Sequence, residues 1–510
     1  MSQGILPFKY EIEPINSGLT ALAGLPSYLD LAAVCGLTDS IRRHLTVTSN
    51  QQQGWTDEQI VMALVLLNLA GGESVDDLRI LEGDEGFAKV MRRVETHGLP
   101  RSERRALEKR WRKERRRAVP SPSPVFRYLS AFHNYDEENK RQEGKAFIPA
   151  PNEHLQSLQK VNTDLIAFAQ QKNPQKTATL DMDATLVETQ KRQSLFCYKG
   201  YKSYQPLNTY WFEQNLMVHS EFRDGNVPAG YEQLRVLKEA LEGLPEGVET
   251  VCLRSDTAGY QHELIRYCAE GKNERFGIIK FAIGVDVTPA FKEAVATVPE
   301  SEWHPLSEEI RPGKFFKTNQ EWAEVCFVPN GLAVKKSGPD YRFIAIRQPL
   351  EQTELFDTEI SQQLPFPTMT FQKPGPYKIF GSVTNHTLPG EEVIHWHRQR
   401  CGNSEKAHSI MKEDLAGGRL PSGDFGENAA WWMIMLLAFS LSSIMQYLVL
   451  PSNWASKRLK AIRFGFINLA GRVMERSRQL VIRLSGKHPS TSLLFDVRQR
   501  ILQLALVPSG

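Results

Sequence analysis

The spacing of hydrophobic residues changes near residue 175. Before it, apolar residues recur every three or four positions, which is the period of a helix buried on one face. The clearest run, Ile60–Leu69, follows Thr56-Asp57-Glu58-Gln59, whose Thr and Gln have the spacing of a capping box. Gly71-Gly72 then predicts the end of that helix. After residue 175 short apolar runs of strand length follow, so the pattern predicts a helical region and then an α/β region.

Strand-like and helix-like segments alternate from residue 177 to residue 285. The first predicted strand, Thr177–Glu188, carries two carboxylates. The segments that follow it are a predicted strand pair (Asn208–Phe212 and Leu216–Phe222), a helix (Tyr231–Leu241), a strand (Thr250–Arg254), a helix (Gly259–Cys268) and a strand (Phe276–Val285). This order predicts an α/β unit with a single mixed sheet.

Residues 286–390 interrupt this alternation. Strand-like segments at Glu324–Val328 and Arg342–Arg347, followed by a Pro-rich stretch, predict a β-rich insertion. Ile379–Thr384 has strand composition again and is expected to lead back into the core. Trp303 and Trp322 lie in the insertion and are candidates for stacking on bases, with a place in the hydrophobic core as the alternative.

Two segments near the C-terminus have unusual compositions. Ala429–Leu450 has 22 residues without a charge, which is long enough to span a membrane. Its Ser and Gln residues, and its place after another predicted helix, favour a helix buried against the sheet. Lys457–Lys487 carries nine Lys and Arg against one Glu and is predicted to be a basic helix that docks on the protein, contacts DNA, or does both. Its apolar stripe would consist of Ile462, Phe466, Leu469, Val473 and Leu480.

Composition excludes some classes of protein. With 510 residues, 24% of them charged and 41% hydrophobic, the chain has the make-up of a globular protein of several domains. The six cysteines form no CxxC pair, which argues against a disulfide scaffold or a zinc ribbon and is typical of a reducing cytoplasm. The first residues contain no charged segment followed by an apolar one, so no secretory signal is expected.

The net charge of +3 conceals a strongly basic segment. Arg101–Arg117 contains ten Lys and Arg against three Glu and is compatible with a helix. It is either a solvated helix with internal ion pairs or an element that contacts the phosphates of DNA. Short helices, a Pro-rich break and a basic helix are typical of a helix-turn-helix-like module. The candidate DNA contacts are Arg110, Arg112, Arg115 and Arg116.

Carboxylates stand at the ends of two predicted core strands. Asp181 and Asp183 are two residues apart on the first strand and therefore point to the same face. Asp256 follows Thr250–Arg254 at its C-terminal end, where open α/β sheets bind their ligands. A carboxylate that leaves a core strand is costly unless it is paired or holds a metal. Taken singly, each could also cap a turn or a helix.

A third acidic residue lies in the first turn of a later predicted helix. Asn403 is the expected N-cap of this helix, and Glu405 follows within the first turn. Lys412 lies seven residues further, two turns along the same face, and Arg400 precedes the helix. This group is either a structural ion-pair cluster or a metal ligand beside cations that bind phosphate.

Three motifs carry a resemblance to a known family. LDMDAT at 180–185, LRSDTAGY at 253–260 and HRQRCGNSEKAHSIMK at 397–412 resemble the motifs of DDE transposases of the bacterial insertion-sequence type. The resemblance extends over most of the chain and implies a ribonuclease H-like catalytic domain with a β-rich insertion before the final Glu. In this family the last motif contains, in this order, an aromatic residue, an Arg, a Glu and a Lys seven positions after the Glu. Here His397 occupies the position where a Tyr is common.

The resemblance also implies a set of site residues. Asp183 is preferred to Asp181 as the first ligand because the family pattern is Asp, a small residue and Thr. Asp183, Asp256 and Glu405, which are 73 and 149 residues apart, would be catalytic residues that hold two Mg²⁺ ions, with Mn²⁺ as a substitute. The cations of the last motif that would contact DNA are Arg400 and Lys412.

The function that the resemblance implies is cut-and-paste transposition in a bacterial cytoplasm. The chain would bind terminal inverted repeats, cleave the strands and join the ends to target DNA, as a homodimer and without a membrane. It would divide into a helical DNA-binding region (1–150), two parts of the catalytic core (175–285 and 391–450), the β-rich insertion (286–390) and a basic helical C-terminal region (451–510). The alternatives are an inactive DNA-binding protein with the same fold and a ribonuclease H-like nuclease without strand transfer.

Overall fold

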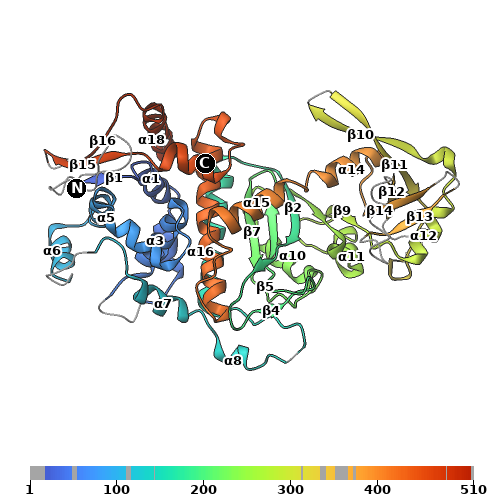
Figure 1. Ribbon diagram of the computed structural model, residues 1–510, viewed down its shortest axis with the longest axis horizontal. Coiled ribbons are helices and arrows are strands. Elements are labelled where there is room, and N and C mark those ends of the chain that lie inside the picture. Colours follow the sequence, from blue (N-terminus) through green and yellow to red (C-terminus); the bar gives the residue numbers. More distant parts are fainter. Residues whose placement is uncertain are drawn as a thin grey trace, which may run out of the picture.

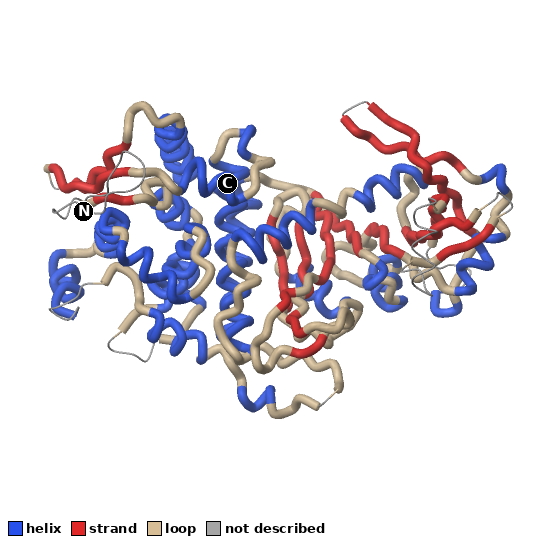
Figure 2. The backbone as a smooth tube through the Cα atoms, viewed as in Figure 1, coloured by secondary structure: helices blue, strands red, loops and turns tan. Residues whose placement is uncertain are grey.

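The computed structural model describes residues 18–48, 54–110, 117–142, 144–311, 314–332, 341–350, 366–371, 375–477 and 479–506. Helices of the N-terminal region occupy one end of an elongated molecule (Figure 1). The main sheet lies in the middle, and a β-rich segment forms the other end (Figure 2). Ten strands from these last two parts form one continuous sheet.

The predicted mixed sheet is confirmed. Strands β2, β8 and β9 run parallel to one another, and the β6–β7 hairpin pairs antiparallel with the other edge of β2. Helices α9 (Glu153–Lys172) and α16 (Phe425–Ile444) pack against β7, while α10 contacts β7 and α11 contacts β9. The elements of this core are β2 (Thr177–Ala184), β6 (Leu207–Trp211), β7 (Leu216–Glu221), α10 (Gln233–Glu242), β8 (Thr250–Ser255), α11 (His262–Ala269) and β9 (Lys280–Gly284).

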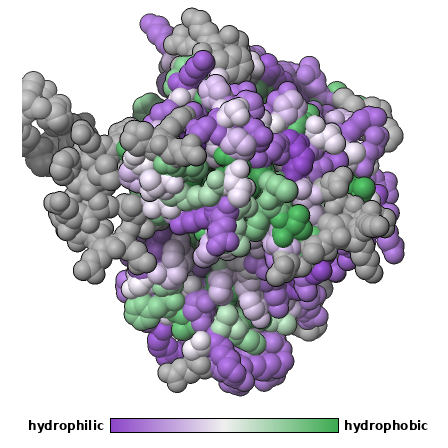
Figure 3. All heavy atoms as spheres, turned by 90° about the vertical axis from the view of Figure 1, so that its right-hand side faces the viewer, coloured by the Kyte–Doolittle hydropathy of each residue, from purple (hydrophilic) through white to green (hydrophobic). Residues whose placement is uncertain are grey.

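The β-rich segment extends the core sheet and does not form a separate one. Its long strand β14 pairs along one edge with β12, and its last residues, Ser382–Thr384, pair antiparallel with β9. The predicted return of Ile379–Thr384 to the core is therefore confirmed. On the face seen in Figure 3, a central group of hydrophobic side chains is bordered by hydrophilic ones. The elements of this segment are α12 (Pro289–Ala296), β10 (His304–Arg311), β11 (Lys314–Val325), β12 (Arg342–Pro349), β13 (Thr368–Thr370) and β14 (Pro376–Thr384).

Both tryptophans of this segment are packed inside it. Trp303 is buried, and the guanidinium carbon of Arg347 lies 4.1 Å from the centre of its ring. Trp322 presses against Gly390, where even a Cβ would come within 2.3 Å of the ring. Trp303 therefore belongs to the core, which is the alternative that the sequence left open, and Trp322 is half-buried and packs against a core cluster.

The N-terminal region is helical. Helix α3 begins with the predicted capping box, because the Thr56 hydroxyl accepts from the backbone N–H of Gln59 and the Gln59 amide oxygen accepts from that of Thr56. It ends at Gly71, whose φ of 97° is left-handed and suits glycine. The helices are α1 (Pro26–Val34), α2 (Leu37–His44), α3 (Asp57–Ala70), α4 (Leu78–Gly83), α5 (Glu85–Glu95), α6 (Arg101–Arg110), α7 (Pro122–Ser130), α8 (Tyr135–Glu138) and α9 (Glu153–Lys172).

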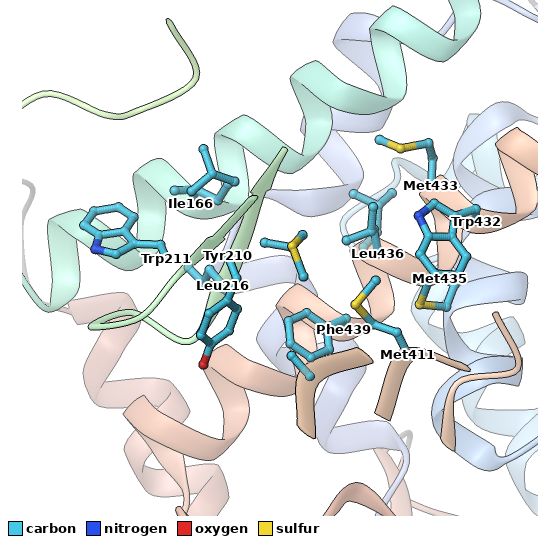
Figure 4. Close-up of a cluster of buried hydrophobic side chains, with 14 of the residues drawn as sticks. Ile166, Tyr210, Trp211, Leu216, Met411, Trp432, Met433, Met435, Leu436 and Phe439 are labelled. Carbon is cyan, nitrogen blue, oxygen red and sulfur yellow. The ribbon is translucent and has the colours of Figure 1, made fainter. Parts of the chain in front are cut away.

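Helix α16 (Phe425–Ile444) is the centre of the molecule, and every one of its residues is buried. It lies between α3 on the N-terminal side and α9 and β7 on the sheet side. Figure 4 shows its side chains Trp432, Met433, Met435, Leu436 and Phe439 among residues of the sheet and of α9. Ser440 of α16 donates to Asn162 of α9, which in turn donates to the carbonyl of Met217 in β7, so buried polar atoms fix this packing.

Within the described residues, one helix is long and apolar enough to cross a membrane. It is Phe425–Val449, and 89% of its apolar window is buried inside the protein. The helix pair Asp57–Ala70 and Val75–Gly83 meets the same criterion only if its two helices, which are bent by 93° relative to each other, are taken as one span. The prediction that Ala429–Leu450 is a buried helix agrees with this packing.

The prediction of one basic helix over Lys457–Lys487 is wrong. Only α17 (Leu459–Ile462) and the turn after it are helical, and β15 (Gly471–Arg476) and β16 (Gln479–Leu484) form a hairpin that pairs with β1 (Leu19–Thr20). Alternation explains the hairpin, since Val473 is buried between less buried neighbours. The strand partner β1 lies at the far end of the sequence, where helical periodicity cannot reveal it. Helix α18 (Ser490–Leu506) ends the described chain.

Candidate active site

Two aspartates leave neighbouring parallel strands at the same level. Met182 of β2 is the register partner of Ser255 of β8. The residues that follow them, Asp183 and Asp256, are therefore neighbours at the ends of the two parallel strands. The end of β2 is also paired with β6, where Asn208 lies opposite Asp183. The carboxyl ends of parallel strands are where α/β sheets bind ligands.

Asp181 is engaged in a buried ion pair. Its carboxylate oxygens accept from Nε and Nη2 of Arg254 at 2.6 and 2.9 Å, and both side chains are fully buried. Burial raises the pKa of Asp181, and the Arg254 guanidinium opposes that rise. Arg254 also donates to the carbonyl of Trp396 at 2.9 Å and lies over the Phe212 ring. With both oxygens occupied, Asp181 is a structural residue, which favours Asp183 as the chemical one.

Asp183 faces a shared cluster of charge. Its Oδ2 lies 3.2 Å from Nη1 of Arg400 and 4.0 Å from Nδ1 of His408. Burial raises the pKa of Asp183 to about 6, the charges of Asp256 and Glu405 add to that rise, and Arg400 opposes it. The Asp256 and Glu405 carboxylates therefore act on Asp183, although the three residues come from distant parts of the sequence.

Asp256 and Glu405 are held by the starts of two helical segments. Asp256 caps the turn Thr257–Gly259 by accepting from the backbone N–H of Ala258 at 3.0 Å. Glu405 is exposed in the first turn of α15 (Asn403–Ser409). The expected N-cap Asn403 is wrong, because Gly402 takes that place with a φ of 85°, which a side chain would strain.

The two predicted DNA-contact cations of this motif both lie at the site. Arg400 contacts Asp183, and its buried Nε has no hydrogen-bond partner within the described part of the chain. Lys412 lies in a π-helical turn after α15 and donates to the carbonyl of Leu186 at 3.3 Å. Burial lowers the pKa of Lys412, and the nearby Asp183 carboxylate counteracts this effect. By contrast, Arg110 is the last residue of α6 and nothing is described of its side chain, and Arg112, Arg115 and Arg116 lie outside the described residues.

His397 anchors the helix that leads to Arg400. It lies in α14 (Gly390–Arg398), where its Nε2 is 2.8 Å from the carbonyl oxygen of Ser255 and its Nδ1 is 3.3 Å from the Ser382 hydroxyl. Burial lowers its pKa to about 4, so the ring is neutral at pH 7, with Nε2–H donating and Nδ1 accepting. His397 therefore ties α14 to the residue before Asp256.

His408 is a site residue that sequence reasoning missed. The Trp432 indole donates to the Ser220 hydroxyl at 2.8 Å, and that hydroxyl donates to Oδ1 of Asn208 at 2.6 Å. The Asn208 amide then donates to Nε2 of His408 at 3.1 Å, which leaves the Nδ1–H on the side of Asp183. Burial lowers the pKa of His408 to about 3. The spacing of Glu405 and His408, three residues apart on one helix, was the available signal.

The donor atoms at this site suit a hard divalent cation. Carboxylate oxygens are the ligands that Mg²⁺ and Mn²⁺ prefer, and repulsion among carboxylates is what a bound cation would relieve. Among the described residues, no three His, Cys, Asp or Glu side chains already lie close enough together to hold a metal ion. Asp183, Asp256 and Glu405 thus fit such an ion in the type of their ligand atoms, and their side chains would have to move closer together to hold it.

Comparison with known proteins agrees with this chemistry. The family profile described as "Transposase DDE domain group 1" matches residues 17–506. No curated protein matches the chain. A solved structure titled "Cryo-EM structure of piggyBac transposase synaptic complex with hairpin DNA (SNHP)" is 12% identical with a TM-score of 0.44, and the alignment covers 94% of this chain and 80% of that one.

The buried pair predicts a large loss of stability when one partner is removed. Arg254→Met should lower the free energy of unfolding by about 3–5 kcal/mol, because it leaves Asp181 charged and unpaired in the core. The double change Asp181→Leu with Arg254→Met should recover much of this loss. Urea unfolding followed by circular dichroism measures both. Arg79→Met, which breaks an exposed pair with Asp76, is the control and should cost less than about 1 kcal/mol. An Arg254→Met loss as small as that of the control would contradict the prediction.

The raised pKa of Asp183 predicts a pH-dependent cost to folding. The folded-state pKa of about 6 lies above the value of about 3.9 for a free Asp. Stability from this group is therefore fully present below about pH 4 and is lost as the pH rises through about 6. In EDTA, Asp183→Asn should be more stable than the wild type by up to about 3 kcal/mol at pH 8.

Unfolding across the pH range checks this expectation. The gap between the two proteins should close towards pH 4, and Mg²⁺ should narrow it at pH 8 by stabilising only the wild type. The exposed Asp76→Asn is the control and should show no such trend. A wild type at least as stable as Asp183→Asn at pH 8 in EDTA would show that burial and the neighbouring carboxylates do not destabilise the charged form of Asp183.

Proposed function

Because the chain belongs to the transposase DDE domain group 1 family, we propose that it moves a bacterial insertion sequence. It binds the terminal inverted repeats of its element, cleaves the DNA strands and joins the ends to target DNA. It acts as a homodimer on double-stranded DNA in the cytoplasm. Two ends must be held together for such a reaction, which is the reason for a dimer.

The single observation that carries this proposal is that Asp183 and Asp256 follow a register pair of neighbouring parallel strands, with Arg400 on Asp183 and Glu405 in the first turn of the helix after Arg400. Asp183, Asp256 and Glu405 are 73 and 149 residues apart in sequence, and the charges of Asp256 and Glu405 add to the rise in the pKa of Asp183. Arg400 contacts Asp183, and Lys412 follows Glu405 by seven residues and donates to the carbonyl of Leu186 near the end of the Asp183 strand. Acidic groups that would hold a cation, next to cations that would bind phosphate, support phosphoryl transfer more than any other chemistry.

Each of these residues has a task in the proposed reaction. Asp183, Asp256 and Glu405 would hold two Mg²⁺ ions, or Mn²⁺, and these ions would supply an activated hydroxyl and stabilise the leaving oxygen. Arg400 would exchange its bond to Asp183 for a bond to the scissile phosphate, since a guanidinium binds phosphate in two-point fashion. Lys412 adds positive charge on the same side. His408 and His397 orient the helices that carry these groups.

We further propose which part of the chain performs each task. Residues 175–285 and 391–450 form a ribonuclease H-like catalytic core, and residues 286–390 are an insertion before the final Glu. Residues 1–150 bind DNA with the basic run 101–117, and the C-terminal region 451–510 assists. The continuity of β9 with β14 supports this division, because the insertion enters and leaves the sheet through adjacent strands.

Glu405→Gln should leave folding and DNA-end binding nearly intact while abolishing cleavage. Gln has almost the same volume, but it removes a charge and a ligand oxygen, so the rate should fall about a thousandfold or more. The measurements are thermal unfolding, binding to the terminal repeat, and cleavage with Mg²⁺. Glu413→Gln is the matched control, because Glu413 is exposed and pairs with Arg458 at 2.6 Å.

Near wild-type cleavage by Glu405→Gln would show that the third carboxylate is assigned wrongly, and Glu413 or Glu427 would then be tested. A strand-joining assay with a pre-cleaved end separates a transposase from a nuclease without strand transfer. Intact binding with no cleavage by the wild type would instead indicate an inactive DNA-binding protein.

The basic run predicts a salt-dependent contribution to DNA binding. Replacing Arg110, Arg112, Arg115 and Arg116 with Ala should weaken binding and flatten its dependence on salt, because fewer counterions are released. Binding to unrelated duplexes should fall nearly as much as binding to the terminal repeat, since phosphate contacts carry no sequence information. Titrations at several salt concentrations measure the slope. An unchanged slope would mean that the run is only a solvated surface.

A further inference from the structure

A small sheet follows directly after the catalytic strand. Its strands are β3 (Val187–Glu188), β4 (Leu195–Phe196) and β5 (Lys202–Tyr204), paired in the order β3-β5-β4. The β4–β5 connection is a tight turn, in which the N–H of Gly200 donates to the carbonyl of Cys197 and the N–H of Cys197 to that of Tyr201. Gly200 has a φ of 82°, as expected of the left-handed position in such a turn. We refer to residues 195–204 as the aromatic hairpin.

The base of the aromatic hairpin is fixed. A Cβ on Gly225 would come within 2.5 Å of the Ser203 carbonyl oxygen, so the neighbouring chain packs tightly on β5. The segment before β4 is tied to α16 and to the loop before it, because Lys191 donates to the carbonyl of Pro421 and Gln193 accepts from the N–H of Phe425. Tyr204 is buried. The aromatic hairpin is therefore held in one conformation before any ligand binds.

The tip of the hairpin presents aromatic rings and cations to solvent. Phe196 is 62% exposed and Tyr198 is 77% exposed with respect to the described part of the chain. Nζ of Lys199 lies 5.9 Å from the centre of the Tyr198 ring. Lys202 and Arg192 add two more positive charges, against the single acidic Glu188 of β3. Exposed rings beside Lys and Arg provide a surface on which a flat π-system can stack.

The hairpin also borders the carboxylate site. Lys412 donates to the carbonyl of Leu186, which immediately precedes β3. Leu186 lies two residues after Ala184, the end of the strand that carries Asp183, and the next residues, Val187 and Glu188, pair with Tyr204 and Ser203 of the hairpin. A DNA strand bound at Asp183 would therefore pass beside the aromatic hairpin.

We propose that the aromatic hairpin stacks on an unpaired base of the DNA strand held at the carboxylate site. This inference rests on the proposed function and deepens it by naming a contact for the strand beside the scissile phosphate. Bases have a π-face whatever their sequence, so exposed rings flanked by Lys and Arg suit a single strand with little sequence preference. A duplex offers no such face along its length, so the hairpin should discriminate between paired and unpaired ends.

Binding to a forked duplex tests the proposal. The full chain is titrated in EDTA, which prevents cleavage, with a short fluorescent duplex that has one unpaired end and with the same duplex fully paired. The wild type should bind the forked duplex more tightly. The double change Phe196→Ala with Tyr198→Ala should lose about tenfold in affinity for the forked duplex and little for the paired one. Tyr198→Phe keeps the ring and should behave as the wild type.

Phe495→Ala is the matched control, since it removes a ring that is 64% exposed on α18. It should leave the preference for the forked duplex unchanged, and unfolding temperatures should show that all variants are folded. A wild type without a preference would overturn the proposal, and so would a double variant that keeps it. A double variant that changes only self-association in light scattering would also overturn it, by making the hairpin a protein contact.

These outcomes are separate from those that test the proposed function. Loss of the forked-end preference depends only on binding, because no metal is present. A chain that cuts DNA through Glu405 but shows no preference would refute the stacking contact alone. A chain that prefers the forked end but never cuts or joins DNA with Mg²⁺ would refute the proposed transposition alone.

Discussion

The Asp181 carboxylate and the Arg254 guanidinium form a buried ion pair that joins β2 to β8. Arg254 also binds the carbonyl of Trp396, so the same pair holds α14 against the sheet. Since α14 leads to Arg400 and then to α15, the position of Glu405 depends on this pair. Two carboxylates on one strand thus divide their roles by environment. Both oxygens of Asp181 accept from the fully buried Arg254, whereas Asp183 has an ion pair with Arg400 through Oδ2 at 3.2 Å and is the carboxylate that the proposed function assigns to chemistry.

Asp183 shows what an acidic site costs a protein without a bound cation. Burial and two neighbouring carboxylates raise its pKa to about 6, and the Arg400 guanidinium and a hydrogen bond from the backbone of Ala184 oppose that rise. The protein tolerates this cost because several hydrogen bonds hold the elements around Asp183 in place. The hydrogen-bond series from Trp432 to His408 and the anchoring of His397 on Ser255 fix both sides of the site. Functional sites are commonly placed where the surrounding structure absorbs such strain.

Helix α16 connects the parts of the molecule. It is buried along its whole length between the N-terminal helices and the sheet, and the Trp432 indole reaches into the hydrogen-bond series behind the site. Arg463 donates to carbonyls of Asn68 and Asp414, which fastens the C-terminal segment to α3 and to the helix of Glu405. The N-terminal helices are therefore packed firmly against the part of the chain that carries the carboxylates, and under the proposed function this packing would hold a bound DNA end in a fixed position relative to them.

Local patterns in the sequence determined much of this structure. The capping box of α3, the strand–helix alternation after residue 177 and the uncharged Ala429–Leu450 helix depend on neighbouring residues, and each is found in the structure. The motifs also identified Asp183, Asp256 and Glu405 as candidates, because a family pattern can be read without coordinates. From the residues alone, Asp181 remained an alternative to Asp183 as the first metal ligand.

Only the tertiary structure decided the features that depend on distant partners. Arg254 as the counter-ion of Asp181, Asn208 as the partner of His408 and the continuity of β14 with β9 join residues at least 73 positions apart. The C-terminal hairpin was predicted as a helix for the same reason, since its partner β1 lies at the other end of the chain. Hydrophobic periodicity reports which side of an element is buried, but it carries no information about what buries it.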